Sequence, residues 1–213
     1  MNSMLKLLAF AVAVAALPAC QSPAPPNLPK STLPPPPKKD LRIVALGLGT
    51  QNYTCGAETE APKSVGAVAQ LYDVTALVSI PIFGDWEAEY LTCNANHANT
   101  NYGQRKIGVH YFDAEGTPTF DLTTGTRSVE HRGGLFLSAA KKASADAPDK
   151  ACPGRNGAPA VPWLLLEDKK NGKTRGLSQV YRVNTVGGTA PETCRGQKKS
   201  FTVDYAAEYW FYT

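Results

Sequence analysis

Three histidines, His97, His110 and His131, have the residue type best suited to metal binding or to acid–base chemistry near neutral pH. His110 lies in a strand-like stretch, whereas His97 and His131 lie in polar stretches. No two of them have the i,i+2 or i,i+4 spacing that is typical of a metal site. A site shared by all three is possible in principle, but separate structural positions are the simpler interpretation. We therefore predict no metal ion.

Other catalytic groups give equally unspecific signals. No serine lies in a Gly-x-Ser-x-Gly turn, so a hydrolase nucleophile has no candidate. Several carboxylates could pair across strands for acid–base work, although a solvated face is the ordinary explanation. These carboxylates are Asp85, Glu87, Glu89, Asp204 and Glu208.

The stretch Gly47-Leu-Gly-Thr-Gln-Asn52 follows an apolar run, as the phosphate-binding loop of a dinucleotide site does. Its third glycine is missing and no amphipathic helix follows, because Cys55 and Pro62 soon interrupt the chain. A plain β-turn is the better interpretation, and we predict no nucleotide cofactor.

Aromatic side chains could form a platform that stacks on sugar rings, although core packing is the commoner role of a tryptophan. Trp163 enters the apolar run 161–166 and is expected in the core. Trp210 and Tyr212 are different, because the alternation of the last segment places them opposite its apolar face. They are our candidate ligand-binding residues, with cell-wall polysaccharide or a host surface component as partner.

The elements that position these residues are mainly strands. The clearest pattern runs from Phe201 to Tyr212, where apolar and polar side chains alternate with period two, as in a half-buried strand. We also expect strands over 41–46 and 51–55 around a Gly-Leu-Gly turn, and over 65–72 and 76–82. The runs 106–112 and 117–122, joined by Asp-Ala-Glu-Gly, predict a hairpin.

Two polar segments, 84–105 and 138–160, interrupt the strands and are expected to be long surface loops. They carry Cys93 and Cys152, and a bridge between these two cysteines would order both loops. The predicted fold is all-β: a single antiparallel β-sandwich or barrel-like domain over 40–213.

The front of the chain is expected to direct export. Lys6 followed by the apolar run 7–17 and small residues is typical of a signal peptide over 1–19, and the run is too short to span a bilayer. Residues 20–39 are crowded with proline and are interpreted as a solvated linker or pro-segment. The sequon Asn52-Tyr53-Thr54 is a candidate glycosylation site. The sequence around Cys20 also resembles a bacterial lipoprotein box, in which case Cys20 would carry a lipid anchor.

The charge balance limits the binding partners that the sequence allows, and the cysteines indicate how the fold is cross-linked. The formal charge of +4 is accounted for by four lysines before Asp40, which leaves 18 basic and 18 acidic residues in the rest of the chain. A neutral domain without a basic stripe has little means of holding nucleic acid, so nucleic acid is excluded as a partner. If the leader is cleaved after Cys20, four cysteines remain at wide spacing, which favours two disulfides over zinc, whereas earlier cleavage would keep Cys20 as an odd thiol. The four are Cys55, Cys93, Cys152 and Cys194.

Six ordered motifs lie along the domain, at 46–55, 66–73, 108–112 with 117–121, 161–164, 180–194 and 205–212. Through these motifs the domain resembles domain-of-unknown-function family 3455, and its details are similar to the fungal branch, which favours secretion over a lipid anchor. The family has no agreed activity. Fungal members are often labelled malate dehydrogenase, but this chain lacks the nucleotide loop and the Arg/His/Asp set of that enzyme.

The resemblance also implies a second disulfide. Cys55 and Cys194 both belong to motifs of the family. We therefore expect them to lie close together in the family's fold and to form a disulfide bond. Ala76 stands where a cysteine is common in the fungal pattern, so the family's full disulfide scheme does not carry over unchanged.

Two functions remain. The favoured one is a secreted, disulfide-stabilised binding protein of the extracellular space or cell wall, with an unknown oligomeric state. The alternative is a secreted enzyme, such as a hydrolase, with a site around His110, Tyr181 and Arg182. A deep polar pocket around His110 and Arg182 would favour the enzyme, and a shallow aromatic strip would favour the binder.

Overall fold

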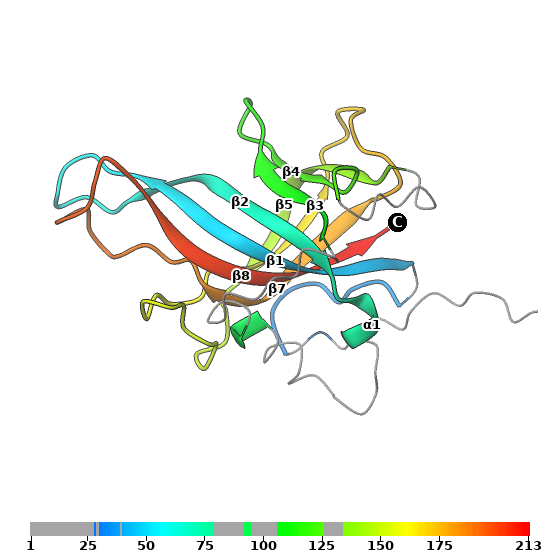
Figure 1. The fold of residues 1–213 in the computed structure, drawn as a ribbon, viewed down its shortest axis with the longest axis horizontal. Coiled ribbons are helices and arrows are strands. Elements are labelled where there is room, and N and C mark those ends of the chain that lie inside the picture. The colour runs from blue at the N-terminus through cyan, green and yellow to red at the C-terminus, as the bar shows by residue number, and fades with distance from the viewer. Residues whose placement is uncertain (1–27, 29, 39, 79–91, 95–105, 126–133) are drawn as a thin grey trace, which may run out of the picture.

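The computed structural model describes residues 28, 30–38, 40–78, 92–94, 106–125 and 134–213, and within them the chain forms a closed antiparallel barrel (Figure 1). Each strand pairs with its neighbours in sequence, and the last strand closes on the first. The elements are β1 (Leu41–Thr54), β2 (Lys63–Asp73), α1 (Thr75–Val78), β3 (Lys106–Phe112), β4 (Pro118–Asp121), β5 (Phe136–Ala145), β6 (Trp163–Asp168), β7 (Gln179–Gly187) and β8 (Ser200–Tyr212). The all-β prediction is confirmed, and the architecture is the barrel rather than the sandwich.

The strands β1, β2 and β8 are the longest, and their paired ends extend beyond the other strands on the left of Figure 1. β1 pairs with β8 from Leu41 to Thr54, with one irregularity at its start. At the extended end Cys55, which directly follows β1, is bonded to Cys194 in the loop before β8, with 5.6 Å between their Cα atoms. The predicted Cys55–Cys194 disulfide is therefore confirmed.

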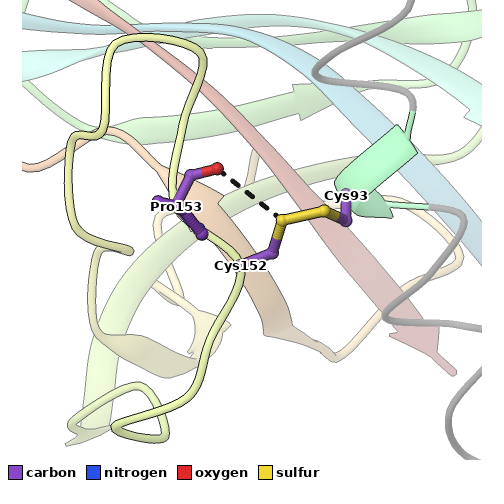
Figure 2. The surroundings of a disulfide bond; sticks show 3 residues. All are labelled: Cys93, Cys152 and Pro153. Atoms are coloured by element: carbon purple, nitrogen blue, oxygen red, sulfur yellow. Dashed lines mark hydrogen bonds between the residues drawn. A yellow bond between two sulfur atoms is a disulfide. The ribbon is translucent and has the colours of Figure 1, made fainter.

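The second predicted disulfide, Cys93–Cys152, is also confirmed (Figure 2). Cys93 lies in a short helical turn over 92–94, and Cys152 lies in the irregular segment between β5 and β6. The Cys152 sulfur lies 3.6 Å from the Pro153 carbonyl oxygen, a contact without a shared hydrogen because a disulfide sulfur carries none. The bridge ties the segment over 92–94 to the β5–β6 loop.

Two apolar layers stabilise the barrel, one on each side of its wall. The inner layer lines the interior of the barrel with side chains from all eight strands, including Tyr205, Tyr209 and Phe211 of β8. The outer layer covers one side of the wall and includes Trp163, Trp210 and Tyr212. Leu33 and side chains of α1 pack over this outer layer, so both faces of the wall are apolar there.

The first strand differs from its prediction. The runs 41–46 and 51–55 are one continuous strand, β1, and no turn interrupts it at Gly47. A Cβ atom at Gly47 would clash with Cε2 of Tyr209, so glycine here makes room for a large ring inside the barrel. The glycines that predicted a turn are thus explained by close packing, because Gly47 faces the Tyr209 ring of β8 and Gly49 faces the backbone of Val68 on β2.

Two other predictions are wrong for the described residues. Residues 76–78, expected in a strand, belong to the short helix α1, while 79–82 lie outside the described residues. Residues 138–145, expected in a loop, belong to β5, whose lysines are exposed. By contrast, the β3–β4 hairpin is confirmed, with Asp113 accepting the backbone N–H groups of Glu115 and Thr117 in its turn.

The proline-rich segment is not wholly solvated, in contrast to the prediction. Leu33 is 6% exposed and belongs to the outer layer. The hydroxyl of Tyr181 donates to the carbonyl oxygens of Pro34 and Pro35, at 3.2 and 3.4 Å. Part of this segment therefore packs on the barrel. Among the described residues, no helix is long and apolar enough to cross a membrane.

Candidate functional site

A cluster of polar side chains lies inside the barrel, in contrast to its otherwise apolar filling. Its members come from four strands and are at most 9% exposed: Gln51 of β1, His110 of β3, Arg182 of β7, and Tyr205 and Tyr209 of β8. Burial of this many polar groups is costly unless each gains a hydrogen bond. The cluster is therefore the part of the described interior that needs a functional explanation.

His110 is held in one orientation as a neutral ring. Its Nδ1 lies 2.9 Å from the carbonyl oxygen of Thr119, so Nδ1 carries the hydrogen and donates it. The ring lies flat on Phe120, with 4.2 Å between centroids and an angle of 10° between planes. Burial lowers the pKa of His110 to about 4, and Nε2 is then a bare acceptor at neutral pH.

Arg182 brings a full positive charge into the barrel. It is the only lysine or arginine among the buried residues that the structure describes. One Nη donates to the carbonyl oxygen of Pro162 at 2.7 Å, and the side chain also bonds to Tyr209, its register partner on β8. No carboxylate lies within ion-pair distance of it in the described part of the chain. Among the described residues, only dipoles therefore solvate this charge.

The two tyrosines of β8 bond to each other, with 2.9 Å between the hydroxyl oxygens of Tyr205 and Tyr209. Burial raises the pKa of both, so both hydroxyls keep their hydrogens at neutral pH. One of the two hydrogens forms the bond between them. The other remains available to a further acceptor.

Two buried donors in the cluster have no hydrogen-bond partner among the described residues. They are Nε of Arg182 and Nε2 of Gln51. Leaving a buried donor unpaired costs about 1–3 kcal/mol, and more for a charged group. Native proteins leave few such groups unexplained, so a missing partner is the natural inference.

A groove of about 490 Å³ lies at the same end of the barrel as Gln51. Its lining includes Phe201 and Val203, which pair across the β1–β8 register with Tyr53 and Gln51. Tyr53 stacks on Phe201 and donates its hydroxyl to the carbonyl oxygen of Gly188 at 2.8 Å. The rest of the lining comes from 156–159, from the loop between β7 and β8, and from Thr202 and Asp204 of β8.

The structure brings only part of the predicted enzyme site together. His110 and Arg182 both contact Tyr209 inside the barrel. Tyr181 lies on the opposite face of β7 and bonds to the proline segment. Sequence reasoning missed Gln51, Tyr205 and Tyr209, although the alternation of β8 already placed both tyrosines on its inward face.

The predicted binding residues Trp210 and Tyr212 are on the outer face of β8, as the alternation indicated, but they are not exposed. Their exposed fractions are 1% and 0%. The error has a physical reason, since Leu33 and α1 cover the outer layer. A surface strip that stacks on sugars is therefore not formed by these two side chains.

Glu208 is the only buried carboxylate of the described residues, and it lies on the outer face next to Trp210. Burial raises its pKa to about 7, against the hydrogen bonds from Trp210, Asn184 and Thr92. Asn184 has a φ of 47°, in the left-handed region, at an irregularity of the β7–β8 pair. Asp204 is exposed, so Glu208 has no carboxylate partner on its strand, and Asp85, Glu87 and Glu89 lie outside the described residues.

The remaining predicted sites are the glycosylation site at Asn52 and the histidines other than His110. Asn52 is half-buried in β1, and its side-chain oxygen accepts a bond from Thr50 at 3.0 Å, so glycosylation stays a prediction. His97 and His131 lie outside the described residues. Within the described part of the chain, no group of three His, Cys, Asp or Glu side chains is arranged to hold a metal ion.

Comparison with known proteins decides the family. The family model described as "Protein of unknown function (DUF3455)" matches residues 35–213. The chain belongs to this family. The resemblance drawn from the six motifs is thereby confirmed, and the match begins within the proline run rather than at Asp40. No curated protein and no solved structure matches the chain. DUF3455 membership assigns no activity, so the function has to be argued from the site.

Proposed function

We propose that this protein is an exported binding protein that takes one small molecule into the polar cluster of its barrel. The observation that carries the proposal is the pair of buried, unpaired N–H donors on Arg182 and Gln51. A bound molecule with an acceptor atom would satisfy them. Eight strands enclose an interior of the right size either to be filled by side chains or to hold one small ligand.

Binding fits the cluster better than catalysis. His110 is neutral, and its Nδ1 is occupied by the Thr119 carbonyl. Its nearest aromatic contacts are Phe120, Tyr209 and Phe112, none of which is a nucleophile that a histidine ordinarily activates. The one buried carboxylate of the described residues, Glu208, lies on the other side of the barrel wall.

The enzyme remains the second candidate because one specific observation favours it. His110 and Arg182 do share a buried polar site, which is the arrangement expected of the alternative. In that case the bare Nε2 of His110 would act as the base and Arg182 would stabilise a developing negative charge. Chemical conversion of a bound compound would establish this reading.

Export is supported by the two disulfides, which persist in oxidising compartments. Together with the leader-like residues 1–19, they favour a secreted or wall-associated protein. N-terminal sequencing of the secreted product should find a start between Leu17 and Asp40, and the packing of Leu33 favours a start before that residue. A secreted product that still begins at Met1 would remove the leader from the argument.

Wall association is part of the same proposal, but it no longer relies on Trp210 and Tyr212, which are buried. A pull-down of the secreted protein with isolated wall polysaccharide tests it directly. Retention on polysaccharide would place the protein at the wall. Passage through unbound would leave the barrel ligand as its partner.

The binding proposal is tested with a chemically mixed fragment library and nuclear magnetic resonance of the labelled secreted protein. We expect at least one fragment to shift the signals of His110 and of the tyrosines at 205 and 209. Ala67 pairs with Gln51 and points inward, so Ala67→Leu should weaken that binding by placing a larger side chain beside Gln51. Val68→Leu is the matched control, because Val68 is 46% exposed on the outer face. A library with no fragment that shifts the interior signals would contradict the proposal.

A further inference from the structure

We propose that the ligand of the barrel is a small organic carboxylate, bound through Arg182 and Gln51 with its apolar part among the aromatic rings of the interior. This inference rests on the proposed binding function and adds the chemical class of the ligand. Four features of the described residues support it: the sign of the charge, the geometry of the donors, the remaining hydroxyl hydrogen and the walls.

The positive charge of Arg182 favours an anionic ligand. Arg182 is 9% exposed and has no carboxylate partner among the described residues. A buried charge without a counter-charge is strongly unfavourable, and its partners are normally carboxylates or other anions. Its field acts across the cluster, because it opposes the rise in the pKa of Tyr53, Tyr205 and Tyr209 that burial causes. A cationic ligand would be repelled, and a neutral one would leave the charge uncompensated.

The donors match the geometry of a carboxylate. The guanidinium is a planar fork whose neighbouring N–H groups fit the two oxygens of a carboxylate. In Arg182 one Nη is taken by the Pro162 carbonyl, whereas Nε is unpaired. Nε2 of Gln51 offers a second unpaired N–H. The hydrogen that the Tyr205–Tyr209 pair does not use supplies a further donor to the same anion.

The walls favour a monoanion with an apolar body over an inorganic anion. The inward-facing neighbours of the cluster are Phe120, Phe112 and Leu164, and the His110 ring lies flat on Phe120. A phosphate dianion calls for more than the one buried cation that the described residues supply. A carboxylate on an aromatic or aliphatic body uses both the charge and the apolar surface.

The test compares four probes of similar size or charge: benzoate, benzamide, benzylamine and inorganic phosphate. Affinities are measured by isothermal titration calorimetry on the secreted protein, and the place of binding by shifts of the His110 and tyrosine signals. We expect benzoate to bind at least tenfold more tightly than benzamide, and benzylamine and phosphate to leave the interior signals unchanged. Benzoate should also raise the Tm of the protein, and benzamide should raise it less.

Substitutions assign the effect to the named residues. Arg182→Met should weaken benzoate binding at least tenfold, with an equal or higher Tm because an uncompensated buried charge is removed. Gln51→Leu should weaken benzoate binding by a smaller factor. It also provides a second test of the site if the Arg182 variant does not fold. Arg175→Met is the matched control, since Arg175 is exposed and lies over the Phe136 ring at 5.1 Å. Its affinity for benzoate should equal that of the parent.

The outcomes separate this inference from the function on which it rests. Equal binding of benzoate and benzamide in the interior would overturn the carboxylate and leave the binding function standing. Tighter binding of phosphate than of benzoate would replace the carboxylate by an inorganic anion. Unchanged benzoate affinity in both variants would also overturn the inference. If neither the probes nor the fragment library shifts the interior signals, both the ligand class and the binding function are wrong.

Discussion

Trp210 donates its indole N–H to the carboxylate of Glu208, two positions earlier on the same strand, at 2.9 Å. Side chains two apart on a strand lie on the same face, so this bond runs along the outer side of the barrel wall. Asn184 and Thr92 also donate to the carboxylate. Despite these donors, burial raises the pKa of Glu208 to about 7. The outer layer thus contains an acid that is partly protonated at neutral pH.

Glu208→Gln should change how stability depends on pH. The folded pKa of Glu208, about 7, lies above the ordinary value of 4.5, so the fold favours the protonated form. Its contribution to stability is fully present below about pH 4.5 and is lost as the pH rises to 7. The loss is on the order of 3 kcal/mol. Denaturant unfolding at several pH values should show the variant gaining stability relative to the parent across this window. Asp204→Asn, a change at an exposed position of the same strand, should not gain stability relative to the parent. If both variants gain stability equally, the pH dependence does not come from Glu208.

His110 should act in the opposite direction. Burial lowers its pKa from 6.5 to about 4, so the fold favours the neutral ring and stability is lost as the pH falls from 6.5 to 4. The magnitude is again on the order of 3 kcal/mol. The two effects oppose each other between about pH 4.5 and 6.5, which predicts a nearly flat profile for the parent. His110→Phe keeps the stack on Phe120 and should reveal the falling limb that Glu208 causes. A titration of His110 with a pKa near 6.5 would contradict this account.

The two disulfides should differ in their effect on stability. In the chain-entropy model a closure of 139 residues by Cys55–Cys194 stabilises by about 5 kcal/mol, and one of 59 residues by Cys93–Cys152 by about 4 kcal/mol. Cys194 is also buried at 3% exposure, so its replacement by serine places a hydroxyl group in a buried position. Cys194→Ser should therefore lower the Tm more than Cys152→Ser. Non-reducing peptide mapping checks the pairing, and a Cys55–Cys93 or Cys152–Cys194 peptide would disprove it.

The fold was largely predictable where a pattern is local. Period-two alternation identified β8, and the Asp-Ala-Glu-Gly turn identified the β3–β4 hairpin, because both signals lie within a dozen residues. The glycines at 47 and 49 misled the prediction, since Gly47 makes room for the ring of Tyr209, far along the chain, and Gly49 allows the close approach of the β2 backbone at Val68. Amino-acid composition does not distinguish a glycine that forms a β-turn from one that makes room for a neighbouring group.

The candidate site was predictable only in part, for a similar reason. His110 and Arg182 were chosen by residue type, and the closure of β8 on β1 brings them to a common partner, Tyr209. Gln51 gave no signal, because a lone glutamine in a strand is ordinary until the barrel buries it. Trp210 was assigned to the correct face, but alternation cannot say whether that face is covered.

Trp210→Ala should destabilise the protein strongly. The side chain is 1% exposed in the outer layer, and truncation leaves a cavity and removes a donor from Glu208. The expected loss is about 3–5 kcal/mol of unfolding free energy. Tyr111→Ala, at a half-buried position of β3, should cost clearly less. An unchanged melting temperature for Trp210→Ala would return Trp210 to the surface and revive stacking on polysaccharide.

Tyr181 and Tyr212 form a matched pair for the final prediction. Their rings meet edge to face, with centroids 5.8 Å apart, in the same outer layer. The hydroxyl of Tyr181 donates to the Pro34 carbonyl, whereas the buried hydroxyl of Tyr212 has no partner among the described residues. Tyr181→Phe should therefore cost about 1 kcal/mol, and Tyr212→Phe should be neutral or stabilise by a similar amount. In a chain without residues 1–38, Tyr181→Phe should no longer lower the free energy of unfolding. The effect of Tyr212→Phe on that free energy should keep its sign. Chemical denaturation of the two variants in both backgrounds measures this, and an equal loss in both variants of the full-length chain would contradict the assigned bond.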